Sequence, residues 1–427
     1  MAGLPSGVGE RRPAGSRRGR DLALLTVGIM VLAFNLRAAI TSLPPVFPEL
    51  AAALHLSSAS IALLAAVPVL CFGLFSGLAA PLSRGFGEER VLLAALLLLA
   101  GGLLLRGAAP GSMLFPGTVL AGGAIALMNV LLPSLIKRRR PQHAGLLIGA
   151  YLLMLGVGAV VASLIAVPVF RAAAAAPPGS PAAHGSSWPV QLTLGLWALP
   201  AVAAAAVWLP QIRYHTKPER QADHRGRVAV RRHALAWQVA AFMGLQSLNY
   251  YATLSWLPTL FQDRGVTAAA AGGLLALMNA GNAIAAMAVP MLAHRARDQR
   301  LLVAVTVLAC AVGLSGVLLA PTGSAMAWTL LLGLGQGSSL GLAIFFTAAR
   351  APDPVAAASL SGFAQSTGYL IAAVGPLTVG FLHRASGGWT VPVLALLGVC
   401  AFQLWAGWLA GRARTLPLAD DTVRAPR

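Results

Sequence analysis

Long apolar runs separated by short polar segments make up most of the chain between Leu22 and Ala410. Many of these runs reach the roughly 20 helical residues that are needed to cross a bilayer. A closed β-barrel would instead show alternating polarity over short segments, and the chain lacks that pattern. The pattern predicts an all-α membrane protein of twelve transmembrane helices, at residues 22–42, 57–80, 91–109, 113–136, 143–168, 190–209, 235–261, 269–293, 301–320, 325–349, 356–382 and 389–410.

The composition agrees with this fold class. Of the 427 residues, 57% are hydrophobic and 10% are charged, whereas soluble domains carry about 25% charged residues. The net charge of +19 does not indicate a nucleic-acid partner, because the basic residues lie in short clusters between apolar runs. The run from Leu22 to Ser42 is longer than the core of a signal peptide, so we expect it to remain as the first span. Cys71, Cys310 and Cys400 lie inside apolar runs without metal-ligand spacing, which favours small buried side chains.

The distribution of Lys and Arg predicts the orientation, because cytoplasmic loops are enriched in both. With twelve spans and an inner N-terminus, the inner segments hold 26 of the 31 basic residues. The outer segments hold four, namely Arg106, Arg171, Arg264 and Arg384, and Arg37 lies inside the first span. We therefore expect a multi-pass protein of the cytoplasmic (inner) membrane with both termini in the cytoplasm.

The two halves of the chain resemble each other. Ala80-Pro81-Leu82 precedes a basic loop, and Val289-Pro290-Met291 precedes another at the same place in the second half. A duplicated six-helix unit predicts this repetition. We expect a basic N-terminal tail (1–21), an N-terminal six-helix bundle (22–209), a basic cytoplasmic linker (210–233), a C-terminal six-helix bundle (234–410) and a C-terminal tail (411–427).

Arg37 is the charged residue that the pattern places well inside an apolar run. An arginine at the centre of a transmembrane helix costs roughly 2.5–3.5 kcal/mol on insertion scales, so a functional gain should offset it. One interpretation is that the guanidinium faces a central cavity and binds an anionic or strongly polar group through its fork of donors. The alternative is that the side chain snorkels to the outer surface. This is less attractive, because an arginine in the outer leaflet goes against the positive-inside trend. We favour the cavity. Thr41, one turn later, shares this face, whereas Asn35 does not.

Further polar side chains lie within the predicted spans. On the seventh, Gln246, Asn249, Tyr250 and Thr253 follow helical spacing, which favours a cavity wall over bonds between helices. Asn279 and Asn282 lie on the eighth span, and Gln365 and Tyr369 on the eleventh. The candidate substrate-binding residues are therefore Arg37, Thr41, Gln246, Asn249, Tyr250, Asn279, Gln365 and Tyr369.

The sequence lacks several kinds of functional group, and their absence restricts the mechanisms that we expect. Its twelve acidic residues lie outside the deep parts of the spans, and its eight histidines lie at span ends or in loops. Proton-coupled pumps relay protons through intramembrane carboxylates or histidines, so this pattern weakly favours uniport or exchange. We find no nucleophile–base pair, metal cluster or cofactor motif, so we expect no enzyme activity, cofactor or metal site.

Several segments together resemble the cyanate permease and 2-nitroimidazole transporter family of the major facilitator superfamily. They are Asn35-Leu36-Arg37 with Thr41-Ser42, Asn129 to Pro133 with Ile136-Lys137, Tyr250-Tyr251 with Trp256-Leu257-Pro258, Leu277-Met278-Asn279, Gly333 to Gly337, and Leu360 to Ser366 with Gly368-Tyr369. The sequence departs from the family at Ala38, where proline is frequent. The resemblance implies two six-helix bundles around a central site that works by alternating access, with Arg37 as a substrate contact.

The loop from Gly77 to Arg90 resembles the cytoplasmic gating motif of the superfamily. Gly77, Arg84, Gly87 and Arg90 match it, but Pro81 stands near the position where an acidic residue is common. This difference leaves the charge contact of the motif without its usual partner.

These observations favour a monomeric transporter in the lipid bilayer for a small anionic or polar organic solute, such as cyanate-like or nitroimidazole-like molecules. An exporter of hydrophobic drugs is the alternative, and in that case Arg37 would be dispensable. A non-transporting sensor or a channel is a further possibility. The duplicated halves and the lack of an appended signalling domain argue against a sensor.

Overall fold

The computed structural model describes residues 14–175, 187–214, 216 and 230–417. All regular elements among these residues are helical. Most of the predicted N-terminal tail, residues 217–229 of the predicted linker and the last ten residues lie outside the described parts.

The N-terminal half forms one bundle. Its transmembrane elements are α1 (Ala14–Thr41), α3 (Ser58–Phe75) with its continuation α4 (Ala79–Phe86), α5 (Glu88–Ala108), α6 (Pro110–Arg139), α7 (Ala144–Ala174), and α8 (Trp188–Gly195) with α9 (Ala198–Trp208). Pro44 and Pro45 end the first span, as expected of residues that cannot continue a helix. They begin the short helix η1 (Pro44–Val46), which leads into α2 (Phe47–Leu54).

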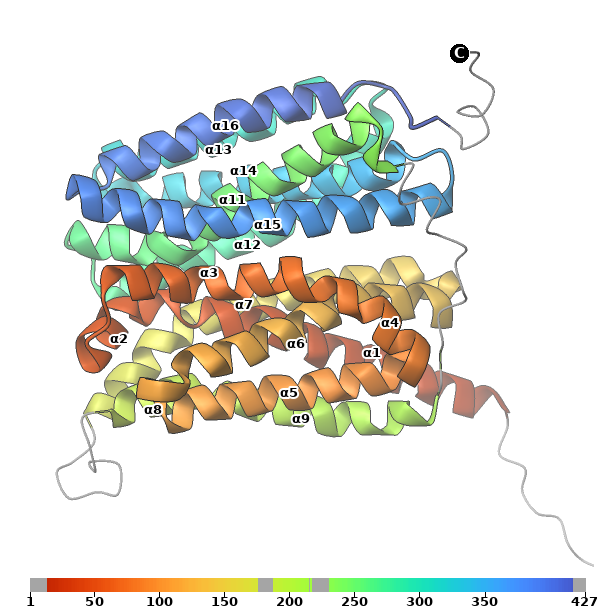
Figure 1. The fold of residues 1–427 in the computed structure, drawn as a ribbon, viewed down its shortest axis with the longest axis horizontal. Coiled ribbons are helices and arrows are strands. Elements are labelled where there is room, and N and C mark those ends of the chain that lie inside the picture. The colour runs from red at the N-terminus through yellow and green to blue at the C-terminus, as the bar shows by residue number, and fades with distance from the viewer. Residues whose placement is uncertain (1–13, 176–186, 215, 217–229, 418–427) are drawn as a thin grey trace, which may run out of the picture.

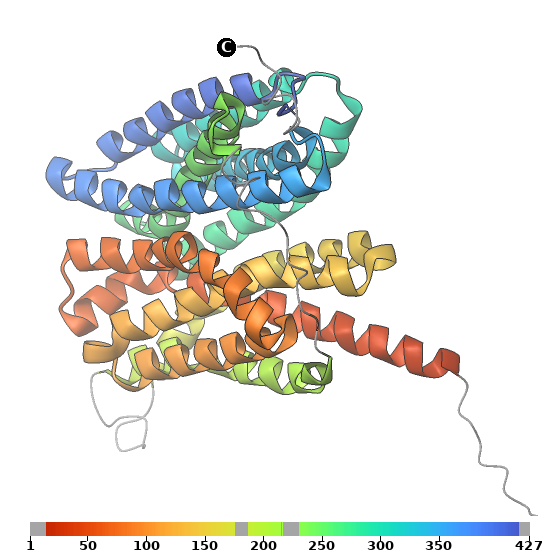
Figure 2. The ribbon, with the colours of Figure 1, turned by 45° about the vertical axis from the view of Figure 1, so that its right-hand side comes forward.

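The C-terminal half forms the second bundle. It contains α11 (Ala234–Asp263), α12 (Ala268–Arg295), α13 (Arg300–Leu319), α14 (Ala325–Ala349), α15 (Pro354–Ser386) and α16 (Thr390–Ala410). Figures 1 and 2 show the two bundles stacked against each other, with α3 and α7 of the first bundle facing α15 and α12 of the second. The predicted all-α architecture of two six-helix bundles is confirmed.

The hydropathy of the helices differs in an informative way. Ten helical segments of the described chain are long and apolar enough to cross a membrane, and α11 and α15 are not among them. These two helices occupy the seventh and eleventh places in the order of spans and contain the predicted polar residues Gln246, Tyr250, Gln365 and Tyr369. Their lower hydropathy therefore comes from polar side chains that the bundle shields from lipid.

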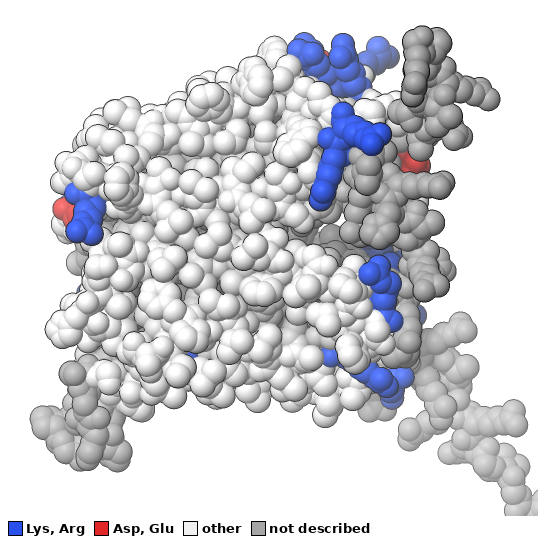
Figure 3. Space-filling view, in the orientation of Figure 1, with Lys and Arg blue, Asp and Glu red and all other residues white. Residues whose placement is uncertain are grey.

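Charged residues gather at one end of the molecule. Figure 3 shows most visible Lys and Arg side chains at the right-hand end, where α4 ends and α5 begins. We name this the basic end, and the other, where α5 meets α6, the opposite end. Gly87 joins α4 to α5 at the basic end with a φ of 87°, a left-handed conformation that favours glycine.

The two bundles contact each other at the centre and toward the opposite end. Phe47 of α2 lies 6.4 Å from Trp256 of α11 between ring centroids, and the Gln262 amide donates to the Pro45 carbonyl. Near the centre, Phe72 of α3 meets Tyr251 and Tyr369 edge-on. In the described chain, the hydrogen bonds and ring contacts between the helices of the two bundles all lie at these two levels.

Candidate functional site

Arg37 lies at the centre of the interface between the bundles. Its guanidinium donates a hydrogen bond of 3.1 Å to the hydroxyl of Tyr250, which belongs to α11 of the other bundle. The side chain is half-buried and its guanidinium is directed at the other bundle. Its role in binding a substrate stays a prediction.

Tyrosines surround the guanidinium. Its carbon lies 5.0 Å from the ring centroid of Tyr250 and 5.7 Å from that of Tyr251, within the range of cation–π attraction. Tyr369 and Tyr151 are also within electrostatic reach of Arg37. Four of the five tyrosines of the chain therefore gather around one arginine.

A chain of hydrogen bonds fixes the orientation of Tyr250. The Asn279 amide donates to the Leu275 carbonyl at 3.0 Å, which turns its oxygen Oδ1 toward α11. The Tyr250 hydroxyl donates to this oxygen at 2.9 Å and accepts from Arg37. Because its one proton is used by Asn279, Tyr250 presents a lone pair to the guanidinium.

We expect Tyr250 and Asn279 to be energetically coupled. Either Tyr250→Phe or Asn279→Leu leaves a buried polar atom without its partner, which costs about 1–3 kcal/mol. The double variant removes both groups, so its loss should be smaller than the sum of the two single losses. Thermal unfolding of the purified protein in detergent measures all four combinations. Strictly additive losses would contradict the coupling.

Arg37 lacks an acidic partner. In the described part of the chain, no carboxylate pairs with it, and the groups within its electrostatic reach are tyrosines. A charge in a low-dielectric interior is costly unless an opposite charge or several hydrogen bonds compensate it. Phenol rings and one hydroxyl compensate it only in part. The site therefore favours a ligand with negative charge or strong acceptor atoms.

Two other predicted site residues, Gln365 and Gln246, each lie one helical turn before a tyrosine of the site. Gln365 is half-buried, as is Tyr369 one turn later, and its amide donates to Ser361 at 2.9 Å. Gln246 is buried one turn before Tyr250 and donates to Ser247 at 2.7 Å.

Thr41 and Asn249 do not join Arg37. Thr41 is fully buried and donates to the backbone carbonyls of Arg37 and Ala159, so its hydroxyl holds α1 against α7. Asn249 turns into the C-terminal bundle and donates to Gln403 on α16 at 3.1 Å. The polar stripe of α11 is therefore divided between two environments, because residues 249 and 250 point about 100° apart.

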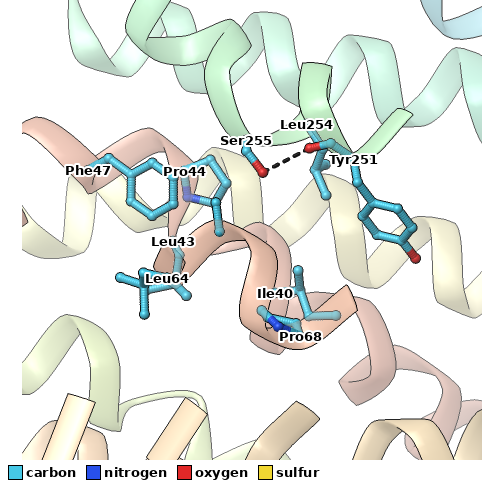
Figure 4. Close-up of a pocket in the computed structure, with 10 residues that line it drawn as sticks. Ile40, Leu43, Pro44, Phe47, Leu64, Pro68, Tyr251, Leu254 and Ser255 are labelled. Carbon is cyan, nitrogen blue, oxygen red and sulfur yellow. Dashed lines mark hydrogen bonds between the residues drawn. The ribbon is translucent and has the colours of Figure 1, made fainter. Parts of the chain in front are cut away.

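A small apolar pocket lies between Arg37 and the opposite end. Figure 4 shows it between the end of α1 and α11, lined by Ile40, Leu43, Phe47, Leu64 and other apolar side chains. The Ser255 hydroxyl in its wall is already bonded to the Tyr251 carbonyl at 2.8 Å. The pocket borders the Arg37 site, because Tyr251 lines it and also lies beside Arg37.

Arg106, which the sequence assigned to an outer segment, lies at the opposite end but is buried there rather than exposed. Arg106 lies in the last turn of α5 and is 1% exposed inside the N-terminal bundle. It donates to the Ala39 carbonyl at 3.3 Å. That carbonyl is released where α1 ends, because the Leu43 amide bonds to Ile40 instead. A cation at a helix C-terminus is favoured by the helix dipole, so Arg106 caps the helix that carries Arg37.

We expect Arg106 to act as a positioning residue. Arg106→Met should lower kcat/KM for transport about tenfold, because small displacements of a binding group are costly. Arg106→Lys can still donate to Ala39 and should retain most of the activity. Substrate uptake into proteoliposomes, with the melting temperature as the folding control, compares the two variants. Equal transport by both would exclude this role.

The residues of the predicted gating loop are all at the basic end. Gly77 lies in η2 (Ser76–Leu78), and Gly87 forms the turn before α5. Arg84 and Arg90 are exposed, and neither forms an ion pair within the described residues. Their gating role stays a prediction.

Two carboxylates to which the sequence pattern assigned no role provide charge contacts in this region. Glu88 and Glu89 are buried at the start of α5 and lie 3.5 Å from Arg138 and 3.9 Å from Arg139 of α6, respectively. Glu89 also accepts from the backbone and side chain of Thr216 in the linker. They hold α5, α6 and the start of the linker together. Their position after a turn glycine at a helix start was the available sequence signal.

Comparisons with known proteins agree with this geometry. The model of the Major Facilitator Superfamily matches residues 28–376. A 2-nitroimidazole transporter of Escherichia coli (strain K12) is 38% identical over 94% of this chain and 98% of its own length. The cyanate transport protein CynX of the same organism is 29% identical over 88% of this chain and 95% of its own length.

A solved structure shows the same fold. A bacterial homologue of the human lysosomal transporter Spinster, in an inward-facing and occupied conformation, has a TM-score of 0.71. It covers 92% of this chain and 96% of its own, at 16% identity. The resemblance predicted from the sequence motifs is thus confirmed, and the chain is a multi-pass membrane transporter rather than an enzyme. It belongs to the Major Facilitator Superfamily.

Proposed function

We propose that the protein carries a small anionic or polar organic solute, cyanate-like or nitroimidazole-like, across the cytoplasmic membrane and binds it at Arg37. The observation that supports this proposal is the half-buried guanidinium at the bundle interface without a carboxylate partner in the described chain. The names of the two relatives, which refer to 2-nitroimidazole and cyanate, fit the same ligand chemistry.

The arrangement suits a planar ligand with acceptor atoms at one edge. A guanidinium presents several donors in one plane and binds paired oxygen atoms, such as those of a nitro group or a carboxylate, with two parallel hydrogen bonds. The rings of Tyr251 and Tyr369, which lie near Arg37, offer apolar faces for a flat solute. A bound anion would replace Tyr250 as the acceptor for Arg37.

Alternating access is supported by the way the bundles meet. In the described chain the hydrogen bonds and ring contacts between the bundles lie at the centre and toward the opposite end, which supports a conformation open to the basic end. By the positive-inside trend, the basic end faces the cytoplasm, so this conformation is inward-facing. The Arg37–Tyr250 hydrogen bond links the bundles at the point about which they would rock. We propose that a monomer completes this cycle.

Uptake into proteoliposomes tests the proposal. Purified protein should give saturable uptake of labelled cyanate or 2-nitroimidazole above protein-free liposomes, and unlabelled substrate inside should drive counterflow. Saturation with counterflow indicates a carrier, whereas flux without either indicates a channel. If neither probe is transported but a hydrophobic dye is expelled, the drug-export alternative replaces the proposal.

A further inference from the structure

A second polar cluster lies within the C-terminal bundle, beside the Arg37 site but directed away from it. It consists of Asn249 and Thr253 of α11, Gln336 and Ser339 of α14, and Gln403 of α16, and we name it the amide cluster. Each of these side chains is at most 5% exposed. So many amides and hydroxyls are costly in a membrane-protein core unless each polar atom has a partner.

Each amide nitrogen of the cluster donates at least one hydrogen bond. Asn249 donates to Gln403 at 3.1 Å, and Gln403 donates to Ser339 at 3.1 Å. Gln336 donates to the Thr253 hydroxyl at 3.0 Å and to the Asn249 backbone carbonyl at 3.4 Å. The Thr253 hydroxyl in turn donates to the same carbonyl at 2.5 Å.

Two acceptor oxygens remain. Asn249 Oδ1 and Gln336 Oε1 are buried and have no hydrogen-bond partner. Reversing the Gln336 amide would not help, because its oxygen would then face the Asn249 carbonyl, which only accepts. The two residues are neighbours, since the Gln336 amide donates to the backbone carbonyl of Asn249. A buried acceptor left unpaired costs about 1–3 kcal/mol, so an unseen partner is expected.

We infer that the amide cluster binds a monovalent cation such as Na⁺. Its free groups are oxygen acceptors, which are the ligands of hard cations, and backbone carbonyls coordinate Na⁺ in other transporters. The cluster contains no carboxylate, and no group of three or more His, Cys, Asp or Glu residues that could hold a metal occurs in the described chain. Because these ligands are neutral and the cost of burying an ion rises with its charge, the site favours a monovalent ion over a divalent one.

The position of the cluster provides a link to the anion site. Asn249 and Thr253 lie on the same turns of α11 as Tyr250, the partner of Arg37. A cation drawn to Asn249 Oδ1 therefore acts on the helix segment that presents Tyr250. This coupling rests on the proposed function: a cation moving with an anion offsets the charge that the anion transfers.

Cation binding can be measured without any transported solute. The full chain in detergent is melted in NaCl, KCl or choline chloride at equal ionic strength. At tenfold excess over the dissociation constant, Na⁺ should raise the melting temperature of the wild type by about 2 °C relative to choline. Gln336→Met removes an unpaired oxygen at similar volume and should abolish the rise. Asn249→Leu removes the other unpaired oxygen; it serves as a second variant if Gln336→Met does not fold and should abolish the rise as well.

Thr306→Val is the matched control. Thr306 is a buried threonine of α13 in the same bundle, bonded only to the Val303 carbonyl at 3.1 Å, and its variant should keep the rise. Equal melting of the wild type in all three salts would overturn the inference and leave a buried water as the partner of these oxygens. An equal rise in the wild type and Gln336→Met would overturn it too.

Uptake in the three salts then tests the coupling. Anion uptake in Na⁺ should exceed that in choline about tenfold, and the ratio should fall to one in Gln336→Met. Salt-dependent melting without any anion uptake would retain the cation site and reject the proposed function. Anion uptake with salt-independent melting would retain the proposed function and reject the cation site.

Discussion

Arg37→Ala is expected to abolish saturable uptake, lowering kcat/KM about 100-fold or more. The variant removes the guanidinium that is central to the site and has no acidic partner within the described chain. Truncating one partner of a buried, hydrogen-bonded charge pair costs about 2–5 kcal/mol, and each 1.4 kcal/mol corresponds to a tenfold change in rate or affinity. Labelled cyanate and 2-nitroimidazole in proteoliposomes are the measurement.

Two further variants separate charge from geometry. Arg37→Lys keeps the charge but loses the planar fork of donors, so we expect affinity to fall about tenfold while some transport persists. Arg384→Ala changes an exposed arginine at the opposite end of α15 and should leave uptake unchanged. Normal transport by Arg37→Ala would remove the proposed anion site and favour a hydrophobic substrate.

The positions of the helical spans could be predicted closely from the sequence. Residues 325–349 were expected to form a span, and α14 has these bounds. The spans are set by local hydropathy, which needs no knowledge of packing. Helix α2 was missed because Pro44 and Pro45 end the first span, and the structure of the next residues depends on contacts with the second bundle.

Which way a side chain points inside the bundle could not be predicted as well. Helical spacing placed Asn249 and Tyr250 on one broad face, but only Tyr250 reaches Arg37, whereas Asn249 meets Gln403. The direction depends on which neighbouring helix fills each side, and these contacts join residues more than 150 positions apart. The buried contact of Arg106 was not predicted for the same reason, since its partner Ala39 belongs to a distant helix.

Glycines set the distance between α12 and α14, and this predicts the largest effect on stability. Gly333, Gly337 and Gly341 succeed one another at intervals of four residues and lie on one face of α14. A Cβ at these positions would meet the backbone carbonyls of Met278, Asn282 and Ala286, respectively. Backbones approach this closely only where small residues line the contact.

Gly337→Ala is therefore expected to lower the free energy of unfolding by about 1–3 kcal/mol or more, because a backbone oxygen cannot give way as a side chain can. Gly398→Ala is the matched control, since a Cβ at that exposed position of α16 meets nothing within 4 Å. That change should be neutral or stabilise the helix by up to about 1 kcal/mol. Thermal unfolding in detergent compares the two variants with the wild type.

Because α12 also presents Asn279 to Tyr250, displacing α12 from α14 should weaken substrate binding as well. Unchanged stability of Gly337→Ala would mean that the two helices can separate freely, and the tight α12–α14 contact would then not hold the bundle together.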